Sequence, residues 1–438
     1  MPKERISGYQ LVMLSSVLYI AGMMCSMFKT LAEVSMQDAW LNFFLAMLYA
    51  WLIAYLLYLL ARAYPGKNMF EICEFACGKW LGRFINVIVL LYVMHLLVRD
   101  LRIFGDFVGT AVLQRTPTEY IYLAAMIVLI YFATGNVEEF TRSVNLLYPI
   151  FFINLLLLPL LLLNEMDMSY IQPILATGAG TVMKGGALSA GWGADIFVFG
   201  AFMSYMGNSR QFYVSLKFGI IVSTVVLTIL MILCLSVLGP ALTCRAIYPV
   251  YTLTQQINIT DFLDRLDVLL IGFWIPAFLF RMIMLYFCFL AGLSSMLGTG
   301  NLRGINVMSG WFALLLTLVS FKSVMEVFRF GNYASFPLAL VVQLLFFVPV
   351  LIGLFVKSFK KPPRKKRAEG SRRLRMAIWV LLAVAMTALF AGGYSGHLYK
   401  GYGIAGGAVY GAALLAIAVV GAIEFWRMNR IVRHPSEP

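Results

Sequence analysis

Long apolar windows alternate with short polar segments along almost the whole chain. A helix needs about 20 residues to cross a bilayer, and the apolar windows cover approximately residues 8–28, 39–61, 84–104, 119–134, 144–163, 188–206, 216–239, 266–297, 305–321, 333–356, 376–393 and 403–425. This pattern predicts an all-α integral membrane protein with twelve spans.

The twelve windows divide into ten plus two. A basic, proline-containing linker at residues 357–375 separates a ten-helix core, residues 1–356, from an Ala- and Gly-rich transmembrane hairpin with its tail, residues 376–438. If spans one to five and six to ten are repeats, the second is inverted, because five is odd. We therefore expect a ten-helix, inverted-repeat, broken-helix transporter fold (5+5) with an appended C-terminal hairpin.

Composition agrees with a membrane protein and excludes a soluble fold. Hydrophobic residues make up 61% of the chain, charged residues 12%, and the mean hydropathy is +0.86. The net charge of +14 does not point to nucleic acid, because the basic residues cluster between the spans. By the positive-inside rule they place both termini and the 357–375 linker in the cytoplasm, where the linker can lie against anionic lipid.

No motif points to enzymatic chemistry. The six cysteines are scattered, without a spacing typical of a metal site or a disulfide framework, and no HExxH, Walker or carboxylate-pair pattern is present. We expect no cofactor, no metal and no catalytic residue. A transporter-like or sensory function is what remains.

Two spans are interrupted by glycine. Gly22 lies inside the first, and Gly191, Gly193 and Gly200 lie in the sixth. A glycine inside a helix costs about 1 kcal/mol relative to alanine, so Gly22 indicates either that the backbone opens or that another group packs closely on it. Broken spans at corresponding positions of two halves predict a ligand site near the middle of the membrane.

Ionisable residues also lie inside spans, where charges are costly and usually paired or functional. The candidates are Arg99 in the third span, Asp195 in the sixth and Arg281 in the eighth. Arg102 and Asp106 are four residues apart and can pair locally, and His95 is expected to be neutral and hydrogen-bonded. Arg281 either snorkels toward the cytoplasmic interface or serves in an ion pair or ligand contact, and the sequence leaves both open.

Five short motifs resemble those of one family. They are Gln37–Leu41, Tyr64–Lys67, Gly78–Gly82, the pairs Leu101-Arg102 and Asp106-Phe107, and Leu113 with Thr116-Pro117. In order and spacing they resemble the spore germination permeases, the B subunits of endospore germinant receptors. These are relatives of the amino acid, polyamine and organocation transporters, and the resemblance covers about residues 6–356.

The resemblance implies a subunit that binds a small nutrient germinant, such as an amino acid. It also implies an A-type membrane subunit and a C-type lipoprotein as partners, and the spore inner membrane as location. Two features depart from the family. Members typically carry an acidic residue after the glycine of the sixth span, whereas Gly200 is followed by Ala201, and they lack the hairpin after Arg375.

On this basis we expect the site between the first, third, sixth and eighth spans. The predicted ligand-binding residues are Ala21, Gly22, Met23, His95, Phe199, Gly200 and Tyr286. Broken-helix backbone would bind the charged ends of a zwitterion, and few side-chain charges would favour an apolar amino acid. A secondary active amino-acid transporter and a structural subunit with a degenerate site are the alternatives; two continuous helices with no cavity between them would favour the latter.

Overall fold

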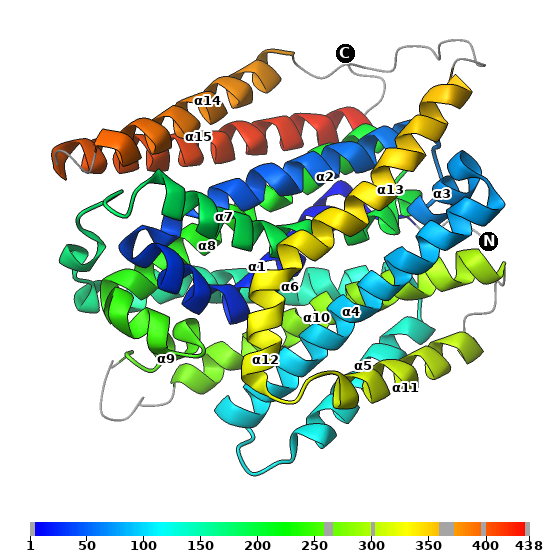
Figure 1. The fold of residues 1–438 in the computed structure, drawn as a ribbon, viewed down its shortest axis with the longest axis horizontal. Helices are drawn as coiled ribbons and strands as arrows, with labels where there is room; N and C mark the ends of the chain where they lie inside the picture. The colour runs from blue at the N-terminus through cyan, green and yellow to red at the C-terminus, as the bar shows by residue number, and fades with distance from the viewer. Residues whose placement is uncertain (1–4, 258–265, 299–302, 359–371, 396–399, 434–438) are drawn as a thin grey trace.

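The computed structural model describes residues 5–257, 266–298, 303–358, 372–395 and 400–433. Within these residues the secondary structure is helical, and most helices run in a similar direction along the long axis of the molecule (Figure 1). Nine described helices are long and apolar enough to cross a membrane, and residues 118–134 and 304–320 form two shorter apolar helices. The predicted all-α membrane class is confirmed, and each predicted window coincides with helical structure, while the count of twelve spans stays a prediction.

The chain alternates α-helices with short 3-10 or π turns, which are labelled η. The first half contains α1 (Gly8–Ser35), η1 (Met36–Leu41), α2 (Phe43–Ala63), α3 (Met69–Cys77), α4 (Lys79–Ala111), α5 (Thr118–Thr134), α6 (Val137–Leu161), η2 (Leu163–Glu165) and η3 (Met168–Ile171). The second half contains α7 (Ala179–Gly193), η4 (Ala194–Gly200), η5 (Phe202–Tyr205), α8 (Ser209–Arg245), α9 (Pro249–Thr254), α10 (Leu266–Leu297), α11 (Arg303–Ser320), α12 (Val324–Arg329), η6 (Phe330–Ala334), α13 (Ser335–Ser358), α14 (Arg372–Ser395) and α15 (Lys400–Arg433).

Helix α1 is continuous, so the predicted opening of the first span at Gly22 is wrong. It begins at a capping box in which the Ser7 hydroxyl accepts from the Gln10 N–H and the Gln10 side chain accepts from the Ser7 N–H. It then runs without interruption through Gly22 to Ser35. The alternative explanation for this glycine, close packing of another group, is the one that the structure supports.

The sixth span does change its helix type. Helix α7 ends at Gly193 and the chain continues as the tighter 3-10 turns η4 and η5. A helix end leaves backbone carbonyls without intrahelical partners, and the Gln343 side-chain amide of α13 donates to the Ala194 carbonyl at 2.9 Å. The Tyr49 hydroxyl in turn donates to Gln343 at 2.7 Å. A polar relay from two other helices therefore stabilises the break.

Small side chains bring α1 and α8 close together at the centre of the bundle. The Ser16 hydroxyl donates to the Gly219 carbonyl and the Ser223 hydroxyl to the Ser16 carbonyl, both at 3.4 Å. An added Cβ on Gly219 would meet the Val12 carbonyl at 3.0 Å. Glycine and serine allow such close backbone approach in membrane helices. Helix α1 is almost wholly buried among its neighbours, with 94% of its apolar window inside the protein.

The C-terminal hairpin packs against the core instead of lying apart. Helices α14 and α15 lie side by side along one edge of the bundle, and α5 with α11 lies along the opposite edge (Figure 1). Helix α15 contacts α8, where the Phe425 ring stacks on Phe218 with ring centroids 5.1 Å apart. A buried ion pair joins Glu424 of α15 to Lys217 of α8. Much of the 357–375 linker lies outside the described residues.

Candidate functional site

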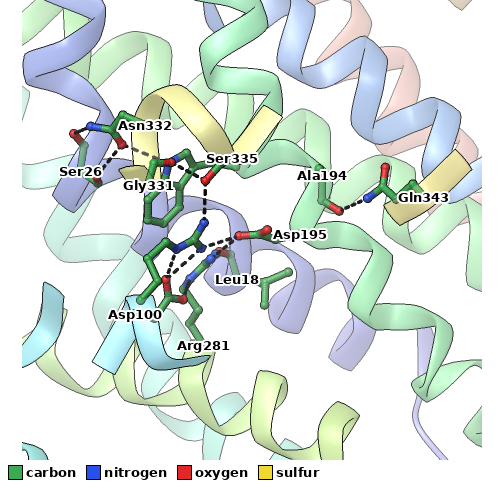
Figure 2. Close-up of polar contacts among 12 residues, drawn as sticks. Leu18, Ser26, Asp100, Ala194, Asp195, Arg281, Gly331, Asn332, Ser335 and Gln343 are labelled. Carbon is green, nitrogen blue, oxygen red and sulfur yellow. Dashed lines mark hydrogen bonds and ion pairs between the residues drawn. The ribbon is translucent and has the colours of Figure 1, made fainter. Parts of the chain in front are cut away.

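Four charged side chains from three distant segments meet in the centre of the protein. Arg99 and Asp100 come from α4, Asp195 from η4 and Arg281 from α10 (Figure 2). Each is at most 1% exposed. We call these four residues the charge network.

The charge network is held by charge-assisted hydrogen bonds. Arg99 Nε donates to Asp100 Oδ1 at 2.9 Å and Arg99 Nη2 to Asp195 Oδ2 at 3.0 Å. Arg281 Nε donates to Asp100 Oδ2 at 2.6 Å, and Arg281 Nη2 donates to the same Asp195 oxygen. Each aspartate therefore binds both arginines, and the two positive and two negative charges cancel. Such pairing is what makes buried charges tolerable in an apolar interior.

Arg281 also fixes the conformation of α1. Its Nη1 donates to the Leu18 carbonyl, and a Cβ added at Gly22 would lie only 2.6 Å from the guanidinium carbon. Gly22 thus provides the space in which the guanidinium reaches the helix backbone. Arg281 does not snorkel toward an interface, because its polar atoms are committed to Asp100, Asp195 and Leu18 in the interior.

The tenth apolar segment closes the network from the other side. Arg99 Nη1 donates to the Ser335 hydroxyl at 3.2 Å, where the π-helical turn η6 joins α13. Its guanidinium carbon lies 3.8 Å from the Trp192 ring centroid, a cation–π contact, and the Trp192 indole N–H donates to the Gly331 carbonyl at 3.1 Å. π-Helical turns are frequent at functional sites, and in this turn the Gly331 carbonyl accepts from Trp192 and so holds the ring against Arg99. Figure 2 shows Gly331 and Ser335 beside the network.

One oxygen of the network is unsatisfied. Asp195 Oδ2 accepts from both arginines, whereas Asp195 Oδ1 is buried and has no hydrogen-bond partner among the described residues. A buried acceptor without a donor costs about 1–3 kcal/mol, and more when it is charged. This oxygen is therefore the place in the network where an additional donor would gain most.

The remaining predicted ligand-binding residues make no hydrogen bond to the network within the described part of the chain. Ala21 and Met23 are buried beside Gly22 on α1, and the other four occupy separate places. The His95 ring packs edge-on against Phe330 at 5.2 Å and its Nε2 has no partner in the described part of the chain, so its predicted hydrogen bond is not seen there. The Tyr286 hydroxyl donates to Asn306 of α11.

Phe199 and Gly200 lie toward the end of η4. The Phe199 ring packs against Phe202 with centroids 5.8 Å apart, and a Cβ on Gly200 would meet Leu57 of α2 at 3.0 Å. The predicted local pair Arg102–Asp106 is confirmed at 3.4 Å.

Two cavities flank the network. A cavity of about 50 Å³, which we call the aromatic cavity, is lined by α1, α4, α6, α9 and α10. A larger one of about 450 Å³, the wide cavity, lies toward α3 and is lined by Glu71, Ala201 and Phe287 among others. Helices α9 and α3 lie at opposite ends of the bundle (Figure 1).

The register along the helices places the network between the cavities. On α10, Trp274 lines the aromatic cavity and Phe287 the wide cavity, seven residues before and six residues after Arg281. At 1.5 Å per residue each cavity is about 10 Å from the network along the axis. The paired charges therefore lie between the two cavities along α10.

Sequence reasoning missed Asp100 as a member of the network and Trp192 as the ring that packs against Arg99. By its position Asp100 belongs with the local pair at the end of the third span, but α4 extends to Ala111 and carries Asp100 into the interior. The available signal was the balance of charges inside the spans. Asp195 and Arg281 each needed a partner of opposite charge, and Arg99 and Asp100 supply one charge of each sign at adjacent positions of the third span.

Gly22→Ala is expected to destabilise the protein by about 1–3 kcal/mol, the usual cost of overpacking. The new methyl group would collide with a guanidinium that two carboxylates hold in place. The measurement is the thermal unfolding of the detergent-solubilised protein. Gly411→Ala in α15 is the matched control, because a Cβ there meets nothing within 4 Å; equal stability of both variants would contradict the contact.

Comparison with known proteins identifies relatives. The family described as "Spore germination protein" matches residues 5–323. The putative spore germination protein YfkT of Bacillus subtilis (strain 168) is 24% identical over 326 residues, covering 74% of this chain and 89% of the relative. Spore germination protein KB of the same organism is 23% identical over 376 residues, covering 84% of this chain and 99% of the relative.

Solved structures establish the type of fold. Mhp1, a nucleobase-cation-symport-1 family transporter in a closed conformation with bromovinylhydantoin bound, matches with a TM-score of 0.59 at 12% identity, covering 96% of this chain and 94% of that one. A mutant of the manganese transporter of Eremococcus coleocola matches with a TM-score of 0.54 at 10% identity, with the same coverage of 96% and 94%. The predicted transporter fold is confirmed, and the apolar helices indicate a multi-pass membrane protein. The chain belongs to the spore germination protein family.

Proposed function

We propose that this protein is the B subunit of a germinant receptor, which binds a small nutrient germinant, an amino acid, and signals to partner subunits that start spore germination. The observation that carries the proposal is the charge-neutral network between two cavities in a chain of this family. The network joins the four spans, first, third, sixth and eighth, between which the ligand site is expected. No described feature suggests an enzyme, and family and fold point to a transporter- or receptor-type membrane protein.

The balance of charges supports a zwitterionic ligand. The ammonium group of an amino acid can donate to the free Asp195 Oδ1, and its carboxylate can take the place of an aspartate on Arg99 or Arg281. A ligand without net charge leaves the network neutral, whereas a lysine or glutamate side chain would bury an unpaired charge at a cost of several kcal/mol. Alanine, valine and leucine are therefore the proposed germinants, with Gly22 and its neighbours Ala21 and Met23 in contact with them.

Exchange of ion pairs gives the ligand a way to act on the fold. The network bonds join α4, η4 and α10, and Arg281 ties them to α1. A ligand that replaces some of these bonds binds one arrangement of the helices better than another, and so shifts their equilibrium. An A-type membrane subunit and a C-type lipoprotein are the proposed readers of this shift in the spore inner membrane, with both termini cytoplasmic.

Secondary active transport of an amino acid is the second candidate function. It is favoured by the position of the network between two cavities at opposite ends of the bundle, as alternating access to one site requires. The wide cavity then leads to the site from the cytoplasmic side in the proposed orientation. The same pocket serves both functions, so only a measurement of uptake against signalling separates them.

Spores that lack this protein are expected to lose germination in response to at least one of alanine, valine or leucine, and to regain it when the wild-type gene is restored. Germination is measured as the loss of optical density after each amino acid is added singly, with lysine and glutamate included. Uptake of the same labelled amino acids is measured in vegetative cells that express the protein.

The two measurements separate the candidates. Lost germination with unchanged uptake supports the receptor, and unchanged germination with lost uptake supports the transporter. A response that is lost for glutamate or lysine but kept for valine would contradict the proposed zwitterionic, apolar ligand. If germination and uptake are both unchanged for the whole panel, the result contradicts both proposed functions.

A further inference from the structure

Positive charge gathers at one end of the C-terminal hairpin, where it meets the start of α8. Four exposed arginines lie in the first turn of α14 and the last turns of α15, namely Arg373, Arg375, Arg427 and Arg430. Glu424 is the only acidic residue in the sequence of these two helices, and it is already bound to Lys217 of α8. The positive-inside rule assigns this end of the bundle to the cytoplasm.

Arg375 is the arginine of α14 that lies beside the core. Its guanidinium acts electrostatically on the Lys217 ammonium and on the Tyr213 hydroxyl, both of α8, and it forms no ion pair with a described residue. Lys217, Arg375 and Glu424 together carry a net charge of +1, and Arg210, which also acts on Lys217, adds further positive charge. The cluster therefore lacks one negative charge.

Tyrosine rings of the core adjoin this cluster. Tyr55 and Tyr58 of α2 pack against Tyr213 with ring centroids 5.9 and 5.5 Å apart, and the Lys217 ammonium lies 5.8 Å from the Tyr213 ring centroid. Tyr55 is 45% exposed, and the Tyr213 hydroxyl makes no hydrogen bond within the described part of the chain. Tyr213 thus contacts the other tyrosines on one side and the charges on the other. We call Tyr55, Tyr58, Tyr213, Lys217 and Arg375 the tyrosine–arginine surface.

The tyrosine–arginine surface lies near the ends of its helices, where a membrane meets water. Tyr213 is four residues from the start of α8, and Arg375 is in the first turn of α14. Trp379 and Trp426 of the hairpin lie near the same end and are 71% and 58% exposed. Exposed tryptophan and tyrosine are enriched at membrane–water interfaces. The group that covers this surface is therefore at the depth of the lipid headgroups.

The phosphate of an anionic phospholipid meets these requirements. It brings the missing negative charge, and its oxygens accept hydrogen bonds from a guanidinium and a phenol. Leu52, one turn from Tyr55 on the same face of α2 and 51% exposed, offers an apolar surface to the acyl chains. A zwitterionic lipid carries its own ammonium group and adds no net negative charge. A soluble anion would leave the apolar side chains uncovered.

We propose that the tyrosine–arginine surface binds an anionic phospholipid, whose phosphate accepts hydrogen bonds from Arg375 of the hairpin and Tyr213 of the core. The bound lipid joins α14 to α8. This site differs from the general attraction of basic segments to anionic membranes, because it uses one arginine of α14 and not its neighbours. It does not depend on the proposed germinant function.

Dioleoyl phosphatidylglycerol and dioleoyl phosphatidylcholine are the probes, because they have the same acyl chains and differ in net charge. The delipidated full-length protein in detergent is titrated with each lipid, and native mass spectrometry gives the number of bound lipids and the Kd. We expect tighter binding of phosphatidylglycerol than of phosphatidylcholine. Arg375→Gln should weaken phosphatidylglycerol binding about tenfold, the effect of losing a hydrogen bond between charged groups, and should leave phosphatidylcholine binding unchanged.

Matched controls are built into the chain. Arg373→Gln removes the same charge from the same turn, but Arg373 lies about 200° around α14 from Arg375 and does not act on Lys217 or Tyr213, so binding should change little. Tyr213→Phe should weaken phosphatidylglycerol binding, whereas Tyr131→Phe, in an exposed residue of α5 on the opposite edge of the bundle, should not. Arg375 is exposed and unpaired among the described residues, so lipid-free Arg375→Gln should melt like the wild type.

Three results would overturn the site. Equal binding of the two lipids by the wild type would show that the missing charge is not supplied by a headgroup. Equal losses in Arg375→Gln and Arg373→Gln would show only a general attraction to positive charge. Displacement of phosphatidylglycerol by millimolar inorganic phosphate would show a site for a soluble anion. Each result holds whatever the germination assays give.

Discussion

Arg281→Met is expected to lower the free energy of unfolding by about 3–5 kcal/mol, the cost of breaking a buried ion pair. Methionine fills a similar volume but leaves Asp100 and Asp195 with a single arginine between them. One negative charge then remains unbalanced in the interior, and the Leu18 carbonyl loses its second donor. Thermal unfolding of the detergent-solubilised protein, followed by size-exclusion chromatography, measures the loss.

A charge-balanced double variant separates this electrostatic effect from lost packing. Asp100→Asn alone leaves an excess positive charge, while Asp100→Asn combined with Arg281→Met leaves Arg99 and Asp195 as one neutral pair. The double variant should be more stable than Arg281→Met, with a coupling energy of about 0.5–3 kcal/mol in a double-mutant cycle. Strictly additive losses would mean that the two side chains are not paired in the membrane.

The same variants bear on the proposed function. The double variant keeps a neutral interior but loses the bond between α4 and α10, so we expect folded protein without a germination response. A normal response from spores that carry the double variant at wild-type abundance would show that this bond takes no part in sensing. Arg281→Met alone cannot answer the question, because its protein level is expected to fall.

Hydropathy was enough to predict the helices, and the glycines and charged residues inside the apolar windows indicated the spans that meet at the network. The apolar windows coincide with helices, and the first, third, sixth and eighth spans do supply Leu18, Asp100, Asp195 and Arg281. These predictions succeed because burial in lipid demands a local property, about 20 consecutive apolar residues. The depth of Arg281 followed from the same local pattern.

Long-range partners could not be predicted in this way. Asp100 and Arg281 are 181 positions apart, and nothing local distinguishes a paired arginine from one that snorkels. Gly22 shows the same ambiguity, because a glycine that opens a helix and a glycine that admits a guanidinium look alike in sequence.

The C-terminal hairpin lies outside the family match but inside the structural match. The family match ends at residue 323, and α14 and α15 lie beyond it. The structural match to Mhp1 nevertheless covers 96% of the chain, and the uncovered part is shorter than either of these helices. We therefore infer that the hairpin is an integral part of this transporter fold and not an unrelated addition, which agrees with its packing on α8.

Glu424→Gln is expected to release the hairpin from α8. Lys217 and Glu424 form an ion pair with side chains only 5% and 9% exposed, and the Lys217 ammonium lies 5.8 Å from the Tyr213 ring centroid. Glutamine cannot balance the buried ammonium, so the variant should lose about 3–5 kcal/mol. Protease cleavage of the 357–375 linker followed by size-exclusion chromatography tests whether α14 and α15 stay with the core.

An exposed pair provides the matched control for this substitution. Arg142 and Glu138 form an ion pair at 2.7 Å with side chains 71% and 38% exposed, so Glu138→Gln should cost no more than about 1 kcal/mol. Lys217→Met added to Glu424→Gln removes the unbalanced charge and should restore most of the stability. If Glu424→Gln and Glu138→Gln melt alike and the cleaved hairpin stays bound in both, apolar contacts such as Phe218 with Phe425 hold the hairpin, and the buried ion pair does not.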